Sequence, residues 1–126
     1  MGILKLWQNK TYKYFMLYSR KFIIPKNTPR SAPIKTSFTI GEKVITKIEV
    51  MMDVVATRTN VGIKISGGKP GLKSFNFPVN ADDWIWMNEI WMGRIEFPEA
   101  NFPIDVIGFN DDDTNDHIVI ISIHTQ

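Results

Sequence analysis

Two histidines are the only side chains in the sequence whose ordinary pKa suits proton transfer near neutral pH. They are His117 and His124, and they flank an apolar run near the C-terminus. Side chains alternate between faces along a strand, so this odd spacing places them on opposite faces and they cannot share one site. We expect His117 to hydrogen-bond to the preceding loop and His124 to be exposed.

Catalytic arrangements are otherwise absent from the local sequence. Nucleophilic catalysis needs a base beside a serine or threonine, and no segment pairs either residue with a histidine in a recognisable motif. The sequence therefore predicts a protein that is not an enzyme and that uses no cofactor. A small hydrolase with His117 as its base is the alternative.

An acidic loop precedes His117, where residues 110–116 read Asn-Asp-Asp-Asp-Thr-Asn-Asp. Calcium takes about six to eight oxygen ligands, but the loop lacks the glycine, glutamate and flanking helices of an EF-hand. We interpret it as a hairpin turn between Phe109 and His117 whose Asn and Asp side chains cap backbone amides. The prediction is no metal. A cation, or the basic segment of a neighbouring copy, is the alternative partner for Asp111, Asp113 and Asp116.

Three of the four tryptophans lie between residues 84 and 91. If this segment is a strand, Trp84 and Trp86 share one face and Trp91 lies on the other, with neither face polar. Such rings fill cores and interfaces, but they can also stack on sugars, so Trp84, Trp86 and Trp91 are candidates for glycan binding. Residues 75–91 contain no Lys or Arg, which disfavours a nucleic-acid platform in the body of the domain.

Charge is strongly segregated along the chain. Residues 1–41 hold eight basic residues and no acidic one, whereas residues 42–126 hold seven basic and thirteen acidic residues. A basic leading segment is attracted to an acidic partner, which could be nucleic acid or the acidic body of a neighbouring copy. A solvated basic strand is the alternative.

We interpret residues 1–17 as a basic and apolar N-terminal arm and residues 18–126 as one domain. Exposed clusters of large apolar side chains usually mark contact sites, so the arm is predicted to dock on another subunit or on the outside of the domain. A short amphipathic helix over residues 2–9 is the rival interpretation. The candidate contact residues of the arm are Leu4, Leu6, Trp7, Lys10, Lys13 and Phe15.

Short apolar segments recur at about ten-residue spacing between turn residues, which is typical of eight or nine strands in a sandwich or barrel. The expected strands cover residues 18–24, 34–40, 44–52, 61–66, 72–77, 84–91, 94–97, 104–109 and 117–124. The proline-punctuated residues 25–33 should cross between sheets, while residues 34–40 and 44–52 look like a hairpin. The sequence has no cysteine for disulfides and no run long enough to span a membrane as a helix. The predicted fold is an all-β, antiparallel, jelly-roll-like β-sandwich with an N-terminal extension.

Two loop motifs and two strands carry a resemblance to known proteins. Residues 24–33 read Ile-Pro-Lys-Asn-Thr-Pro-Arg-Ser-Ala-Pro, and residues 108–117 read Gly-Phe-Asn-Asp-Asp-Asp-Thr-Asn-Asp-His. Together with the strands at 44–50 and 62–65, they resemble a group of short β-sandwich proteins encoded by tailed and other bacterial viruses and found in viral metagenomes. The resemblance covers about residues 18–124. It departs over residues 54–61, where the group commonly has a Pro-x-Gly-Cys-x-Gly-Leu stretch.

The resemblance implies a structural role in the virion, as a decoration, minor capsid or fibre-type subunit located on the head surface or in a host-contact structure. The implied partners are further copies of the chain, the major capsid protein or other virion proteins. Nucleic acid would be contacted only through the basic arm, and no membrane is expected. The alternative function is a carbohydrate-binding, host-attachment module that uses surface tryptophans.

Overall fold

The computed structural model describes residues 15–53, 61–69, 71, 73–80 and 82–126, and over these residues it contains strands and no helix. Hydrophobic and polar residues alternate in most of these segments, as a half-buried strand requires. The strands are β1 (Met16–Ile24), β2 (Ile34–Ile40), β3 (Val44–Met52), β4 (Val61–Gly68), β5 (Ser74–Phe77), β6 (Glu89–Glu96), β7 (Phe102–Asn110) and β8 (His117–Thr125).

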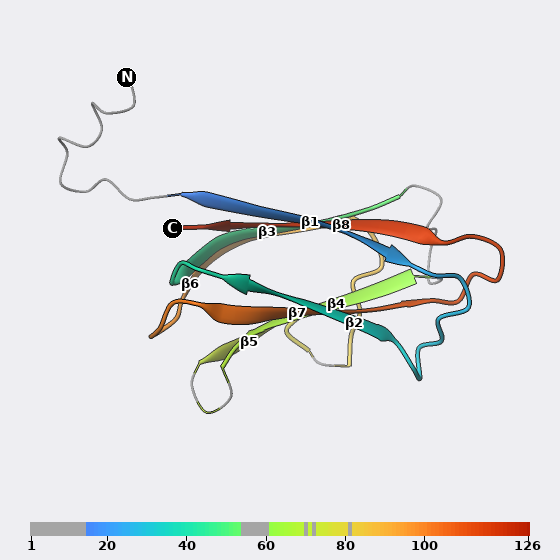
Figure 1. Cartoon of the computed structure of the whole chain (residues 1–126), viewed down its shortest axis with the longest axis horizontal. Helices are drawn as coiled ribbons and strands as arrows, with labels where there is room; N and C mark the ends of the chain where they lie inside the picture. Colours follow the sequence, from blue (N-terminus) through green and yellow to red (C-terminus); the bar gives the residue numbers. More distant parts are fainter. Residues whose placement is uncertain (1–14, 54–60, 70, 72, 81) are drawn as a thin grey trace, which may run out of the picture.

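The strands form two four-stranded sheets that face each other, with the orders β1-β8-β3-β6 and β2-β7-β4-β5 (Figure 1). Every adjacent pair is antiparallel, and β1 pairs with β8, β2 with β7, β3 with β6 and β4 with β5. These pairings describe one long folded ribbon wound into two layers. The fold is therefore a jelly-roll β-sandwich, as the sequence predicted.

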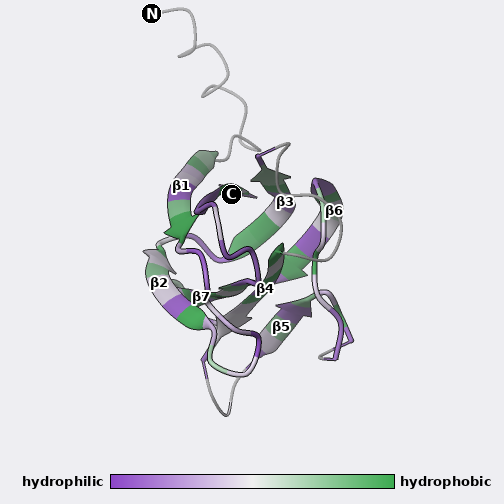
Figure 2. Ribbon diagram, turned by 90° about the vertical axis from the view of Figure 1, so that its right-hand side faces the viewer, coloured by the Kyte–Doolittle hydropathy of each residue, from purple (hydrophilic) through white to green (hydrophobic). Residues whose placement is uncertain are grey.

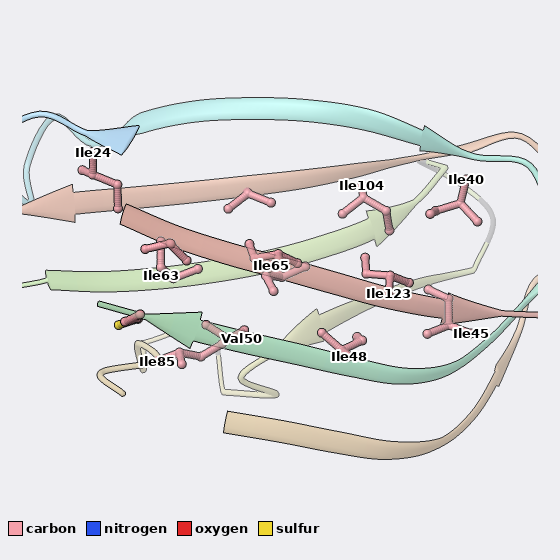
Figure 3. Packing of buried hydrophobic residues seen from close by; sticks show 14 of the residues in the cluster. Ile24, Ile40, Ile45, Ile48, Val50, Ile63, Ile65, Ile85, Ile104 and Ile123 are labelled. Atoms are coloured by element: carbon pink, nitrogen blue, oxygen red, sulfur yellow. The ribbon is translucent and has the colours of Figure 1, made fainter. Parts of the chain in front are cut away.

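The core lies between the two sheets and is rich in isoleucine (Figure 3). On β8, every second residue from His117 to Thr125 points inward and is buried, and the residues between them are only partly covered. The inward side chains of β3, β4 and β7 meet them from both layers. Full burial of one such aliphatic side chain contributes about 1.5–3 kcal/mol to folding, so this apolar layer is the main source of stability.

The segment that joins β1 to β2 crosses from one sheet to the other, as its three prolines predicted. The predicted hairpin of residues 34–40 and 44–52 is wrong, because β2 and β3 have the expected bounds but lie in different sheets. The link between them is held to β1 by Tyr18. The Tyr18 hydroxyl donates to Glu42 (2.7 Å) and accepts from the amide of Gly41 (3.0 Å).

Strand β3 differs from the predicted alternation at a β-bulge between Ile45 and Lys47. The extra residue shifts the pattern by one position, so Ile45 and Ile48 both point into the core and are buried. A strict period of two would place them on opposite faces. Because of the bulge, the buried face of β3 contains Ile45, Ile48 and Val50, and Thr46 does not belong to it.

Two further predictions are corrected by the sheet order. The acidic loop is not a hairpin turn, because it joins β7 of one sheet to β8 of the other. The tryptophan segment is not one strand, since β6 begins only at Glu89. The first strand also begins earlier than expected, at Met16 rather than Tyr18. Before Glu89, Ile85 makes an isolated bridge with Ile63, with amide-to-carbonyl distances of 3.1 and 2.8 Å.

Candidate functional site

His117 lies at the start of β8 with 1% of its side chain exposed, held between two carboxylates. Its Nδ1 is 3.0 Å from Oδ1 of Asp53, and its Nε2 is 3.0 Å from Oδ2 of Asp112. A neutral imidazole can donate only one hydrogen bond, whereas the protonated ring donates two. The arrangement therefore favours a charged imidazolium that ties the end of β3 to the β7–β8 loop.

The pKa values of this cluster follow from its contacts. Burial on its own lowers the pKa of His117, but the hydrogen bonds to Asp112 and Asp53 outweigh burial, and its pKa is raised above 6.5. The hydrogen bond from the backbone amide of Thr114, followed by the bond from His117, lowers the pKa of Asp112 to about 2. The predicted bond from His117 to the preceding loop is confirmed, and its partner Asp53 was not anticipated.

The three acids considered as cation ligands have partners on their own chain. Asp111 lies 3.9 Å from Arg30, Asp113 accepts a hydrogen bond from Thr114, and Asp116 accepts the backbone amide of Lys26 at 2.9 Å. Over the residues that the structure describes, no group of three His, Cys, Asp or Glu side chains is placed to hold a metal ion. Asn and Asp side chains do cap amides in this loop, as predicted.

Trp84 and Trp86 lie on the outer face of the β2-β7-β4-β5 sheet, because Ile85 between them points inward and is fully buried. Both indoles pack edge-on against Phe109 of β7, with ring centroids 4.7 Å apart for Trp84 and 5.7 Å for Trp86. Gly62 makes room for this contact, since a Cβ there would lie 2.3 Å from the Phe109 ring. The two tryptophans are thus brought together, and each is half-buried.

Cations from distant segments cover these rings. The Lys64 ammonium lies 4.4 Å from the ring centre of Trp84, and the Arg30 guanidinium lies 5.2 Å from that of Trp86. Arg30 also lies 4.6 Å from the centre of Phe109. Residues 75–91 contain no Lys or Arg, yet cations lie against these tryptophans. They come from other parts of the chain, Lys64 from β4 and Arg30 from the β1–β2 connection.

Trp91 lies apart from this pair. It belongs to β6 in the other sheet, and its side chain packs against the core from the edge of the sandwich. Beside it is an apolar groove of about 380 Å³, open between β5 and β6. The three tryptophan candidates therefore belong to two separate places.

The outer face of the β1-β8-β3-β6 sheet exposes several large apolar side chains. Its outward side chains include five large apolar residues that are between 52% and 71% exposed: Leu17, Ile23, Met51, Ile90 and Met92. The register brings Met51 beside Ile120 of β8, which is half-buried. We call this surface the outer apolar face. The register places His124 and Lys47 between Leu17 of β1 and Met92 of β6, so the exposed apolar side chains lie mainly along the two margins of this face. Exposed large apolar side chains that gather on one face mark interaction sites.

Several polar side chains of the outer apolar face pair with one another. His124 lies 3.0 Å from Glu49, and Lys47 lies 3.4 Å from the same carboxylate oxygen. Ser19 and Ser122 are in hydrogen-bond contact at 3.3 Å across the β1–β8 pair. His124 is therefore half-buried and bonded rather than fully exposed, and it lies on the face opposite to His117, as predicted. These pairs reduce the cost of covering the face with a partner.

The arm predictions fall mostly beyond the part of the chain that the structure describes. Leu4, Leu6, Trp7, Lys10 and Lys13 lie outside the described residues. Phe15 is described, and its side chain is 71% exposed. The chain enters β1 next to it, at one edge of the sheet that carries the outer apolar face.

Comparison with known proteins adds no family. No protein family model matches the chain, and no curated protein matches it. The described residues form no helix long and apolar enough to cross a membrane.

Proposed function

We propose that this protein is a non-enzymatic structural subunit of a virus particle, which assembles through its N-terminal arm and its sandwich surface. The observation that carries the proposal is the outer apolar face, where large apolar side chains of β1, β3 and β6 are exposed together. Burying such side chains gains free energy at about 25 cal/mol per Å², so a neighbour on this face stabilises the assembly.

Two further observations support a virion role. Jelly rolls are a frequent architecture of viral capsid domains, and they also occur among lectins. The loop motifs at residues 24–33 and 108–117 resemble those of small virion proteins of bacterial viruses. We assign as partner of the outer apolar face a second copy of this chain, because the polar groups at its centre, Lys47, Glu49, Ser122 and His124, are already paired and its margins are apolar. Further partners in the particle include the major capsid protein.

The oligomeric state of the full chain tests this proposal. Light scattering after size exclusion is expected to show an oligomer for the natural chain and a smaller species for the double variant Ile90→Glu/Met92→Glu. Both side chains are exposed, at 61% and 71%, so the variant should fold normally. Electron microscopy of the concentrated protein would then show whether the oligomers close into regular particles or rings.

A charge-matched control is Thr39→Glu/Ser31→Glu, which places two carboxylates at exposed positions of β2 and of the β1–β2 connection. This control should assemble like the natural chain. A natural chain that stays monomeric over the whole accessible concentration range would overturn the proposal, as would equal behaviour of the two double variants.

A second candidate function is supported by the pairing of Trp84 and Trp86 on one outer face, which suits stacking on a sugar ring once Lys64 and Arg30 move aside. Titration with a broad glycan panel should then quench tryptophan fluorescence in the natural chain and in Trp91→Phe. The quenching should be weaker in Trp84→Phe/Trp86→Phe. Absence of any response across the panel would remove glycan binding.

A further inference from the structure

The groove beside Trp91 lies where both sheets end. β5 and β6 are the terminal strands of their sheets on the same side of the sandwich, and β1 and β2 are the terminal strands on the other side (Figure 2). We call the hollow between β5 and β6 the edge groove. Its volume is about 380 Å³, and its apolar walls come from Ile48, Phe75, Phe77, Val79, Trp91 and Ile95.

The walls of the edge groove are suited to receive apolar side chains. Phe75 and Phe77 are alternate residues of β5, and both are only partly buried where they pack on the core. Val79, at the rim, is 87% exposed. Among the described residues no strand pairs with the outer side of β5, so its backbone presents an open edge there. Such an edge can accept an added extended segment.

The residues that line the edge groove are uncharged, so the charge met by an occupant comes from the segments beside it. Residues 74–93, which hold most of the lining residues, contain three acidic residues and no Lys or Arg, and one of the acids, Glu89, lies two positions before Trp91 on β6. This small acidic excess agrees with the N-terminal arm as the occupant. Residues 1–14 carry Lys5, Lys10 and Lys13 and no acidic residue. Opposite charges on two surfaces steer their encounter and disfavour wrong partners.

The apolar pattern of the arm agrees with this occupant. Leu4 and Leu6 are two positions apart, so both would face the same side of an extended segment. Phe75 and Phe77 have the same spacing on β5. An extended segment laid beside β5 could therefore direct two leucines into the edge groove and leave Lys5 outside it.

We propose that the edge groove binds residues 1–14 of a second copy of this chain. This inference rests on the proposed assembly function and names where the arm docks. The chain joins β1 at the edge opposite to the groove, so a neighbour that abuts with its β1 edge brings its arm directly to the groove. Fourteen fully extended residues span at most about 46–50 Å. Such a head-to-tail contact builds rings or open chains.

Cysteine cross-linking of the full chain tests the contact, because the natural sequence contains no cysteine. One copy carries Leu6→Cys and a differently tagged copy carries Val79→Cys, and the two are mixed under mild oxidation. We expect a disulfide between the two tagged copies to form at least about tenfold faster than with the control Thr39→Cys, since docking raises the effective concentration of the two thiols. Thr39 is also exposed, but it lies on β2, at the opposite edge of the sheet that contains β5.

Two results would overturn the inference. Equal rates for Val79→Cys and Thr39→Cys would mean that the arm does not dock in the groove. A chain carrying both Leu6→Cys and Val79→Cys that links only within itself would mean that the groove takes its own arm. If either occurs while Ile90→Glu/Met92→Glu still reduces the oligomer, the proposed function stands and only the arm contact fails.

Discussion

His117, the first residue of β8, lies 3.0 Å from Asp53, which directly follows the last residue of β3. The contact joins Nδ1 of the ring to Oδ1 of the carboxylate. The other oxygen of Asp53 accepts the amide of Ile118 at 2.9 Å, so the carboxylate holds both the ring and the backbone of β8. Because Asp112 binds the opposite ring nitrogen, the imidazole connects β3 to the acidic loop. A buried histidine of this kind makes stability depend on pH.

The first prediction is that the free energy of unfolding falls as pH rises above 6.5, the ordinary pKa of histidine. The pKa of His117 is raised in the folded state, so its stabilisation is fully present below the ordinary value of 6.5 and is lost as pH rises through the folded value. Chemical denaturation at several pH values should show this slope in the natural chain. His117→Gln should remove it, and an unchanged slope in that variant would contradict the assignment.

At acidic pH the sign reverses for Asp112. Its folded pKa is about 2, below the ordinary value of 3.8, so its stabilisation is present above about pH 4 and is lost as pH falls toward 2. Asp112→Asn should reduce the acid sensitivity of the chain. Asp113→Asn is a matched control, since Asp113 is exposed and does not contact His117.

A second prediction concerns Gly62, whose missing Cβ leaves space for the ring of Phe109. A Cβ at that position would lie 2.3 Å from the ring, and Phe109 is fully buried under the tryptophans. Gly62→Ala should therefore destabilise the fold by about 1–3 kcal/mol, the usual cost of overpacking. Thermal unfolding would measure it, with Gly41→Ala as control because a Cβ there meets nothing closer than 3.4 Å. Equal effects of the two changes would refute the packing argument.

Ile85 provides a third prediction, because the sequence alone did not identify it as a core residue outside a strand. Its side chain is 0% exposed, and its backbone pairs with Ile63. Ile85→Ala should cost about 2–5 kcal/mol through lost burial and a residual cavity. The nearby Met87→Ala should have little effect, since Met87 is 66% exposed. Urea denaturation of both variants compares them directly.

A fourth prediction concerns Asn110, a fully buried polar residue at the end of β7. Its side-chain amide donates to the carbonyls of Ile24 and Asn115, both at 3.0 Å, and its oxygen accepts the amide of Asp112 at 2.9 Å. Asn110→Ala should leave these groups without partners and cost about 1–3 kcal/mol or more. The exposed Asn76→Ala serves as control. A loss no larger than that of the control would contradict a structural role for Asn110.

The strands that were easiest to predict lie between clear turn residues. Both β2 and β3 have the bounds expected from sequence, because the proline-punctuated segment ends just before Ile34 and Gly41 separates the two apolar runs. The tryptophan segment was predicted as one strand from its run of apolar residues after a polar turn, although neither of its faces is polar. In the structure the β5–β6 connection extends to Asn88, and Met52 donates its amide to the Asn88 side chain at 2.7 Å just before β6 begins.

The surroundings of Trp84 and Trp86 could not be inferred from neighbouring residues. Lys64 is brought to Trp84 by the pairing of Ile63 with Ile85, which places flanking residues side by side on the outer face. Arg30 arrives from the β1–β2 connection, which Thr28 attaches to Asn110 through an isolated bridge. Neither contact can be predicted from the local sequence around residues 84–86, because both cations are distant from it along the chain.

The amino-acid sequence by itself determined the strand content, the crossing of the proline-punctuated segment and the separation of basic and acidic charge, since each follows from local residue chemistry. Only the tertiary structure decided that Ile34–Ile40 and Val44–Met52 lie in different sheets. It also decided which apolar side chains face outward together. The physical reason is that alternation specifies the two faces of a strand but not the neighbour on either side, which depends on packing between segments far apart in the chain.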